Sequence, residues 1–155
     1  MKERALELGC NVPTGLAILP RNFETAKSKD DLVYEADVAT IRKLWRDAEV
    51  EETKIEKEGD EFPYIIEQSF ECSWVGPTIF LGVQLSPYLV TVALNVISNY
   101  LTDFLKGLPK SKQNVQLHVV KQSARGEGRD YTEIDYTGPP DGIKELYETI
   151  FGSKL

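Results

Sequence analysis

Three residues are candidates for binding an anion: Ser86, Arg125 and Arg129. Ser86 lies where an apolar segment ends and Pro87 opens a predicted helix, and unpaired backbone N–H groups at such a turn can hold an anion. The two arginines are separated by Gly-Glu-Gly, and their guanidinium groups can grip a phosphate or a carboxylate. Structural roles are favoured for both features, because Ser86 can cap the helix and the arginine loop can be a solvated hairpin tip.

A nucleophilic site would have to combine His118 with Cys10 or Cys72. A cysteine attacks as its thiolate, and neither cysteine has a basic neighbour or a predicted helix N-terminus that would lower the thiol pKa. His118 lies in the predicted strand VQLHVVK with no partner close in sequence, so an ordinary surface or half-buried histidine is favoured over a general base. The residue types therefore assign no catalytic group, and they favour a non-enzyme.

Metal and cofactor sites are not indicated. The chain has two cysteines and one histidine, which are too few for a structural zinc site and are not spaced as zinc ligands. The glycine-containing loop around Arg125 lacks the lysine of a P-loop and the third glycine of a dinucleotide fingerprint. We therefore predict no metal and no cofactor.

Acidic residues form a strip between positions 49 and 61. They are Glu49, Glu51, Glu52, Glu56, Glu58, Asp60 and Glu61. A solvated face is the usual explanation of such a strip, and a docking surface for a basic partner is the sharper one. The formal net charge of −7 works against non-specific nucleic-acid binding, because an anionic protein releases no counterions from a polyphosphate. We expect a protein partner and no nucleic acid.

Residues 72–102 contain no Asp, Glu, Lys or Arg, and the run is long enough to cross a membrane. Its β-branched and aromatic residues predict a buried strand over residues 78–85. Pro87 and Gly107 mark the start and the stop of a helix over residues 87–106. Polar residues gather on one side of that helix and large apolar residues on the other, which is typical of a core helix in a soluble domain. We expect no membrane segment.

The remaining pattern predicts an α+β fold. Further helices are predicted over residues 2–8, 37–48 and 139–150, and further strands over residues 15–19, 53–57, 62–69, 115–121 and 131–136. Two pairs of strands, 53–57 with 62–69 and 115–121 with 131–136, are candidate hairpins. The strand, helix, strand order over residues 78–121 permits one parallel crossover. We expect a single two-layer domain over residues 1–155, with two or three helices packed on a mainly antiparallel sheet.

The N-terminal residues MKERALELGCNVP mix charges of both signs before any apolar run, which is unlike a signal peptide. Together with two cysteines interpreted as reduced thiols, this favours a cytoplasmic location. The favoured function is a non-enzymatic protein-binding module or accessory subunit that contacts its partner through an apolar patch bordered by acidic residues. Homo-oligomerisation stays open.

The alternative function is a small-molecule or nucleotide-binding domain, either a sensor or an enzyme. Its pocket would lie between Ser86 and the loop from Arg125 to Arg129, and its ligand would be a small anion. A deep concave site where these residues converge with carboxylates would favour this alternative, and an exposed apolar patch on a convex surface would favour the binding module.

Overall fold

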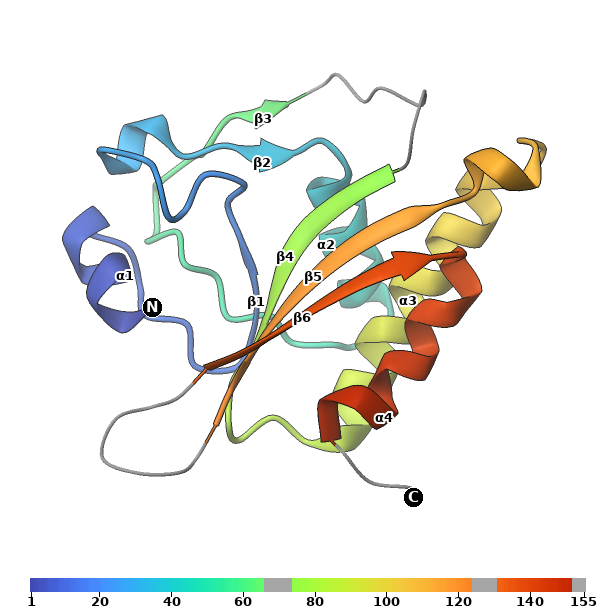
Figure 1. Cartoon of the computed structure of the whole chain (residues 1–155). Helices are drawn as coiled ribbons and strands as arrows, with labels where there is room; N and C mark the ends of the chain where they lie inside the picture. Colours follow the sequence, from blue (N-terminus) through green and yellow to red (C-terminus); the bar gives the residue numbers. More distant parts are fainter. Residues whose placement is uncertain (66–73, 124–130, 152–155) are drawn as a thin grey trace.

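The computed structural model describes residues 1–65, 74–123 and 131–151, which form the single α+β domain predicted from the sequence (Figure 1). The helices are α1 (Lys2–Leu8), α2 (Asp37–Asp47), α3 (Pro87–Leu105) and α4 (Leu146–Phe151), with 3-10 turns at Lys29–Asp31, Lys110–Lys112 and Pro140–Glu145. The strands are β1 (Leu16–Leu19), β2 (Tyr34–Glu35), β3 (Tyr64–Ile65), β4 (Trp74–Leu81), β5 (Val115–Gln122) and β6 (Tyr131–Gly138).

The main sheet has the strand order β1-β4-β5-β6. β1 pairs with β4 and β5 pairs with β6 in antiparallel orientation, whereas β4 and β5 are parallel. A parallel pair needs a long crossover, and α3 supplies it, as the strand, helix, strand order predicts. Figure 1 shows α4 beside α3, and the hydroxyl of Ser98 on α3 donates to the carbonyl of Pro140 at 2.9 Å. The helices α3 and α4 form the layer that packs on the sheet, and this layer is held together by a buried polar contact as well as by apolar packing.

The charge-free run forms β4 and the central helix α3, as expected. Ser86 caps α3, because its Oγ accepts from the backbone N–H of Leu89 at 3.2 Å, and Pro87 occupies the first turn. Gly107 follows the helix with a φ of 96°, a conformation that favours glycine. Within the described residues, α3 is the one helix long and apolar enough to cross a membrane by length and composition. Its fully buried Ile97 and Leu101 belong to the same core as the strands.

The hairpin predicted over residues 53–57 and 62–69 is wrong. Residues 53–57 form no strand, because their backbone groups bind elsewhere: the N–H of Thr53 donates to Leu16 O at 2.6 Å, and Ile55 O accepts from Asn11 at 2.8 Å. The strand β3 keeps two residues of the predicted 62–69, and it pairs in parallel with β2 rather than with residues 53–57. Residues 66–69 lie outside the described residues.

The second predicted hairpin is confirmed as an antiparallel β5–β6 pair, whose connection at 124–130 lies outside the described residues. The strand predicted at 78–85 ends earlier, at Leu81. Gly82 follows it in close contact with the N-terminal segment, since a Cβ built there would lie 2.0 Å from the carbonyl oxygen of Thr14. The last predicted helix is α4 preceded by the 3-10 turn at Pro140–Glu145.

Ile97→Asp tests the position of α3. Ile97 is fully buried, so an aspartate there would place an unpaired charge in the core and lower the free energy of unfolding by at least about 3 kcal/mol. Asn99→Asp is the matched control, because Asn99 is exposed on the same helix. Thermal and urea denaturation followed by circular dichroism measure both variants, and equal stability of the two would contradict the placement of α3 in the core.

Candidate functional site

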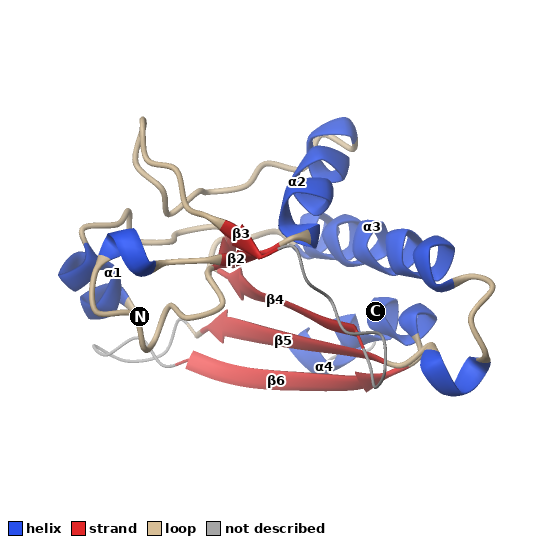
Figure 2. Cartoon of the chain, turned by 90° about the horizontal axis from the view of Figure 1, so that it is seen from above, coloured by secondary structure: helices blue, strands red, loops and turns tan. Residues whose placement is uncertain are grey.

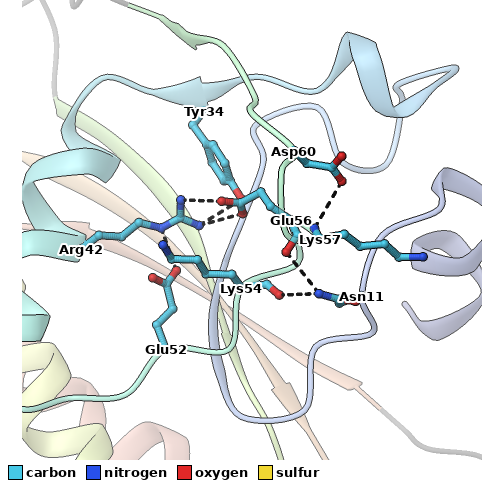
Figure 3. Close-up of polar contacts among 8 residues, drawn as sticks. All are labelled: Asn11, Tyr34, Arg42, Glu52, Lys54, Glu56, Lys57 and Asp60. Atoms are coloured by element: carbon cyan, nitrogen blue, oxygen red, sulfur yellow. Dashed lines mark hydrogen bonds and ion pairs between the residues drawn. The ribbon is translucent and has the colours of Figure 1, made fainter.

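A buried ion cluster is centred on Arg42 of α2 (Figure 3). Its Nε lies 2.9 Å from Glu52 Oε2, and its Nη1 lies 2.9 Å from Glu56 Oε2. Its Nη2 donates to Glu56 Oε1 at 3.0 Å and to the hydroxyl of Tyr34 at 3.1 Å. The Tyr34 hydroxyl in turn donates to Glu56. One guanidinium therefore binds two carboxylates of the acidic strip and a tyrosine of β2.

The protonation states of this cluster follow from burial and from its internal bonds. Burial raises the pKa of Glu52, although the charge of Arg42 opposes the rise. For Glu56, burial is outweighed by hydrogen bonds from Arg42 and Tyr34, so its pKa is lowered. Burial also raises the pKa of the Tyr34 hydroxyl. Burial lowers the pKa of Arg42, but its interactions with Tyr34, Glu56 and Glu52 outweigh burial and raise it. The cluster is thus a cation between carboxylates, with Tyr34 as a neutral donor.

Aromatic side chains extend the cluster to the surface. The Arg42 guanidinium carbon lies 4.6 Å from the centroid of the Tyr34 ring, a cation–π distance. The ring centroids of Tyr64 and Phe62 each lie 5.7 Å from that of Tyr34. Phe62 is buried, whereas Tyr64 is 43% exposed. Tyr64 therefore offers an accessible aromatic ring, and its partner Tyr34 is fixed by Arg42.

A cavity of about 1020 Å³ adjoins the cluster, and we call it the acidic cleft. Its lining includes Tyr34, Arg42, Trp45, Arg46, Glu49, Glu51, Glu52, Lys54, Glu56, Asp60, Glu61, Phe62 and Tyr64. Acidic side chains outnumber basic ones in this lining by six to three. Glu52 and Glu56 bind Arg42, and Asp60 lies 3.1 Å from the Lys29 ammonium. Glu49, Glu51 and Glu61 are exposed. Among the exposed charged residues of the lining, the acids Glu49, Glu51 and Glu61 outnumber the bases Arg46 and Lys54 by three to two. The cleft thus combines an aromatic wall with a rim of slightly negative net charge.

Of the residues predicted to bind an anion, Ser86 is described by the structure and does not line the acidic cleft. Ser86 is the N-cap of α3, the structural role favoured from the sequence. Arg125 and Arg129 lie outside the described residues. A smaller cavity of about 400 Å³ lies where β4 and β5 end, and its lining includes Leu85, Lys121 and Ser123 but not Ser86.

The candidate nucleophilic residues are separated. His118 contacts two carboxylates of β6: its Nδ1 is bonded to Asp135, and its Nε2 lies 3.5 Å from Glu133. Cys10 is buried, and burial raises the pKa of its thiol, as expected for an unreactive cysteine. The charges that act on the pKa of this thiol are those of Lys29, Asp60, Glu56 and Lys57. Cys72 lies outside the described residues.

The sequence interpretation missed Arg42, Tyr34 and Tyr64. A signal for Arg42 was present, since it falls on the apolar face of α2 between Val38 and Trp45, both of which are buried. A charged residue in an apolar stripe must find a buried partner, and the acidic strip that begins seven residues after Arg42 offers several carboxylates. No local pattern marks the aromatic wall, because Tyr34 and Tyr64 come from two strands of two residues each.

Asp37, at the start of α2, is a second buried polar residue. Asp37 accepts from the Tyr100 hydroxyl at 2.9 Å and from the indole N–H of Trp74 at 2.5 Å. Glu35 is also buried, but its Oε2 has no hydrogen-bond partner in the part of the chain that the structure describes. Burial raises the pKa of this carboxyl, and the charge of Arg21 opposes the rise.

No family model matches the chain, and comparison with curated proteins and with solved structures finds no similar protein.

Arg42→Met tests the ion cluster. Methionine keeps much of the side-chain volume but leaves the half-buried Glu52 and Glu56 without their cation, so the free energy of unfolding should fall by about 3–5 kcal/mol. Arg46→Met is the matched control, since Arg46 is exposed on the same helix and should change stability by less than about 0.5 kcal/mol. Equal urea midpoints for the two variants would show that Arg42 does not hold the acidic segment.

Glu35→Gln tests the unsatisfied buried carboxyl. The native pKa of Glu35 is raised, so between the ordinary and the raised pKa the native state binds more protons, and wild-type stability falls as the pH rises. A neutral glutamine avoids this loss, and the variant should be more stable than wild type at pH above the raised pKa, by about 1 kcal/mol.

Below the ordinary glutamate pKa the advantage of Glu35→Gln should disappear, because the wild-type carboxyl is then neutral in both states. Glu51→Gln, at an exposed position, should show no such pH-dependent gain. Chemical denaturation of wild type and both variants across the acidic and neutral range measures the difference. A constant gap between Glu35→Gln and wild type would rule out ionisation of Glu35 as its cause.

Proposed function

We propose that the chain is a non-enzymatic protein-binding module or accessory subunit whose acidic cleft binds a basic segment of another protein. The observation that carries this proposal is the exposed ring of Tyr64 beside the carboxylates of a cavity of about 1020 Å³. A lysine or arginine side chain from a partner can lie over the aromatic ring while Glu49, Glu51 and Glu61 bind its charge.

The deep and the exposed acidic groups have different roles in this proposal. Glu52 and Glu56 are committed to Arg42, so they shape the wall and do not compete for the incoming cation. Because Arg42, Tyr34 and the two glutamates bind one another, their arrangement suits a rigid binding surface better than proton transfer. The exposed carboxylates attract a basic partner at long range and raise its association rate.

The affinity of such a site should be modest and salt-dependent. A cation over an exposed ring contributes about 0.5–1 kcal/mol, and each exposed ion pair contributes about as much or less. One cation–π contact and three exposed ion pairs together contribute at most about 4 kcal/mol, which corresponds to a dissociation constant of about 1 mM. Salt screens these charges over about 8–10 Å. These properties are typical of a subunit that binds and releases its partner.

The cavity of about 400 Å³ at the ends of β4 and β5 supports the alternative function, a small-molecule site near the start of α3. Ligands of sheets with parallel strands often bind at the carboxyl ends of those strands. Lys121 lines this cavity, but its ammonium donates to Ile150 O at 2.5 Å and lies 5.2 Å from the Phe151 ring centroid, which are structural contacts. Native mass spectrometry of the purified chain distinguishes the alternatives, since a retained small molecule would favour this pocket.

Binding of a labelled flexible peptide, in which Lys and Arg alternate with Gly and Ser, tests the acidic cleft. We expect Tyr64→Ala to weaken binding about fivefold, the equivalent of one cation–π contact. Replacement of Glu49, Glu51 and Glu61 by glutamine should weaken it about tenfold and reduce its dependence on salt, because the exposed charges attract the peptide. Fluorescence anisotropy measures the affinities.

Tyr88→Ala is the matched control, because Tyr88 is 75% exposed but lies on α3, outside the acidic cleft. It should leave the affinity unchanged, and a peptide with Glu in place of Lys and Arg should not bind. Equal loss in Tyr64→Ala and Tyr88→Ala, or binding of the acidic peptide, would reject the cleft as the site.

A further inference from the structure

The two edges of the main sheet differ. β1 is engaged along its outer edge, where the carbonyl of Leu16 accepts from the N–H of Thr53. β6 is the other edge strand, and Figure 2 shows it as the outermost strand on its side of the sheet. It has eight residues, longer than the usual five or six, and each of them pairs with β5 on the inner side. In the described part of the chain, no backbone hydrogen bond links its outer side to another segment.

The side chains of β6 give this edge a charge. Ile134 and Tyr136 are half-buried, and Glu133 and Asp135, which alternate with them along the strand, point to the opposite face. The Glu133 and Asp135 side chains are 70% and 79% exposed. Asp135 lies opposite His118 in the register, and the imidazole contacts both carboxylates. The free edge is therefore bordered by two accessible acids on one face.

These acids disfavour a second copy of this chain in the registers that bring them together. A second copy of this chain, paired antiparallel about a two-fold axis at Ile134, would place Glu133 directly opposite Asp135 of that copy. An axis at either acid would place it opposite itself. Like charges directly opposite one another destabilise a strand pair, whereas opposite charges stabilise it. A strand with lysine or arginine at alternate positions would match both acids in one register.

We propose that the outer edge of β6 is a second docking surface, distinct from the acidic cleft, which adds an extended segment of a partner protein with basic residues at alternate positions. Main-chain hydrogen bonds to β6 would hold the segment, and Glu133 and Asp135 would select its charge and register. This inference does not rest on the function proposed for the cleft, because it uses different residues at the opposite side of the sheet.

Three acetylated peptides of equal length test the proposal on the Tyr64→Ala variant, in which the cleft is impaired. The first alternates Lys with Val, the second alternates N-methyl-lysine with Pro, and the third alternates Glu with Val. The second peptide, called Lys-Pro below, keeps the charge but has no backbone N–H donor for a ladder. We expect the Lys-Val peptide to bind at least about tenfold more tightly than the Lys-Pro peptide, and the Glu-Val peptide not to bind.

Amide hydrogen exchange followed by NMR locates the binding. Amides of β6 that exchange in the free protein should become protected by the Lys-Val peptide, and Glu133→Gln with Asp135→Asn should reduce its affinity while leaving the melting temperature near that of the parent. Equal affinity for the Lys-Val and Lys-Pro peptides would show that charge alone causes the binding, without backbone hydrogen bonds to β6, and would overturn the proposal. Protection that maps away from β6, or self-association of the free chain through β6, would also overturn it.

Discussion

The buried guanidinium of Arg42 organises the least regular part of this fold. Residues 48–63 connect α2 to β3 without a helix or a strand of their own, so they cannot satisfy their polar groups through a regular ladder. Arg42 binds Glu52 and Glu56 of this connection. The backbone N–H of Thr53 donates to the carbonyl of Leu16, and the carbonyl of Ile55 accepts from the backbone N–H of Asn11. A cation this deeply buried is tolerable because two carboxylates pair with it and the Tyr34 hydroxyl accepts one of its hydrogen bonds.

This constraint divides the acidic strip into two sets with different physical roles. The carboxylates that face Arg42 are removed from solvent and hold the connection against α2. The connection then leads through Phe62 to Tyr64, whose ring stacks on the Tyr34 ring that Arg42 covers. Glu49 and Glu51 do not contact Arg42, and they lie on the rim of the acidic cleft. The same interaction that fixes the fold therefore produces an aromatic wall beside free negative charge.

Local signals in the sequence predict the regular layers. Ser86 before Pro87 and Gly107 after the apolar face define α3, and the alternation around His118 defines β5 with its antiparallel neighbour. The segment Thr53–Lys57 carries a similar alternation around the buried Ile55, but its backbone bonds to Asn11 and Leu16, which are distant in sequence. An alternation of apolar and polar residues indicates which side chains are buried, but it does not indicate which backbone groups form hydrogen bonds with each other. The strand predicted over residues 53–57 was wrong for this reason.

The candidate site could be predicted only in part for the same reason. The acidic strip and its possible role in docking follow from composition alone. The partition of that strip depends on contacts between Arg42 and residues ten and fourteen positions away, and the cleft depends on two strands too short to give a pattern. Ser86, by contrast, had a sufficient local role, and the structure places it in that role.

The central claim is that the aromatic and acidic cleft binds a basic segment while the Arg42 cluster stays intact. A titration of the isotope-labelled chain with the flexible Lys- and Arg-containing peptide, followed by NMR, tests it most directly. The account predicts saturable shifts of the Tyr64 ring and of the backbone at Glu49, Glu51 and Glu61, with the Arg42 Nε–H signal still protected from exchange. A titration that leaves Tyr64 unchanged, or that exposes the Arg42 Nε–H, would contradict the account.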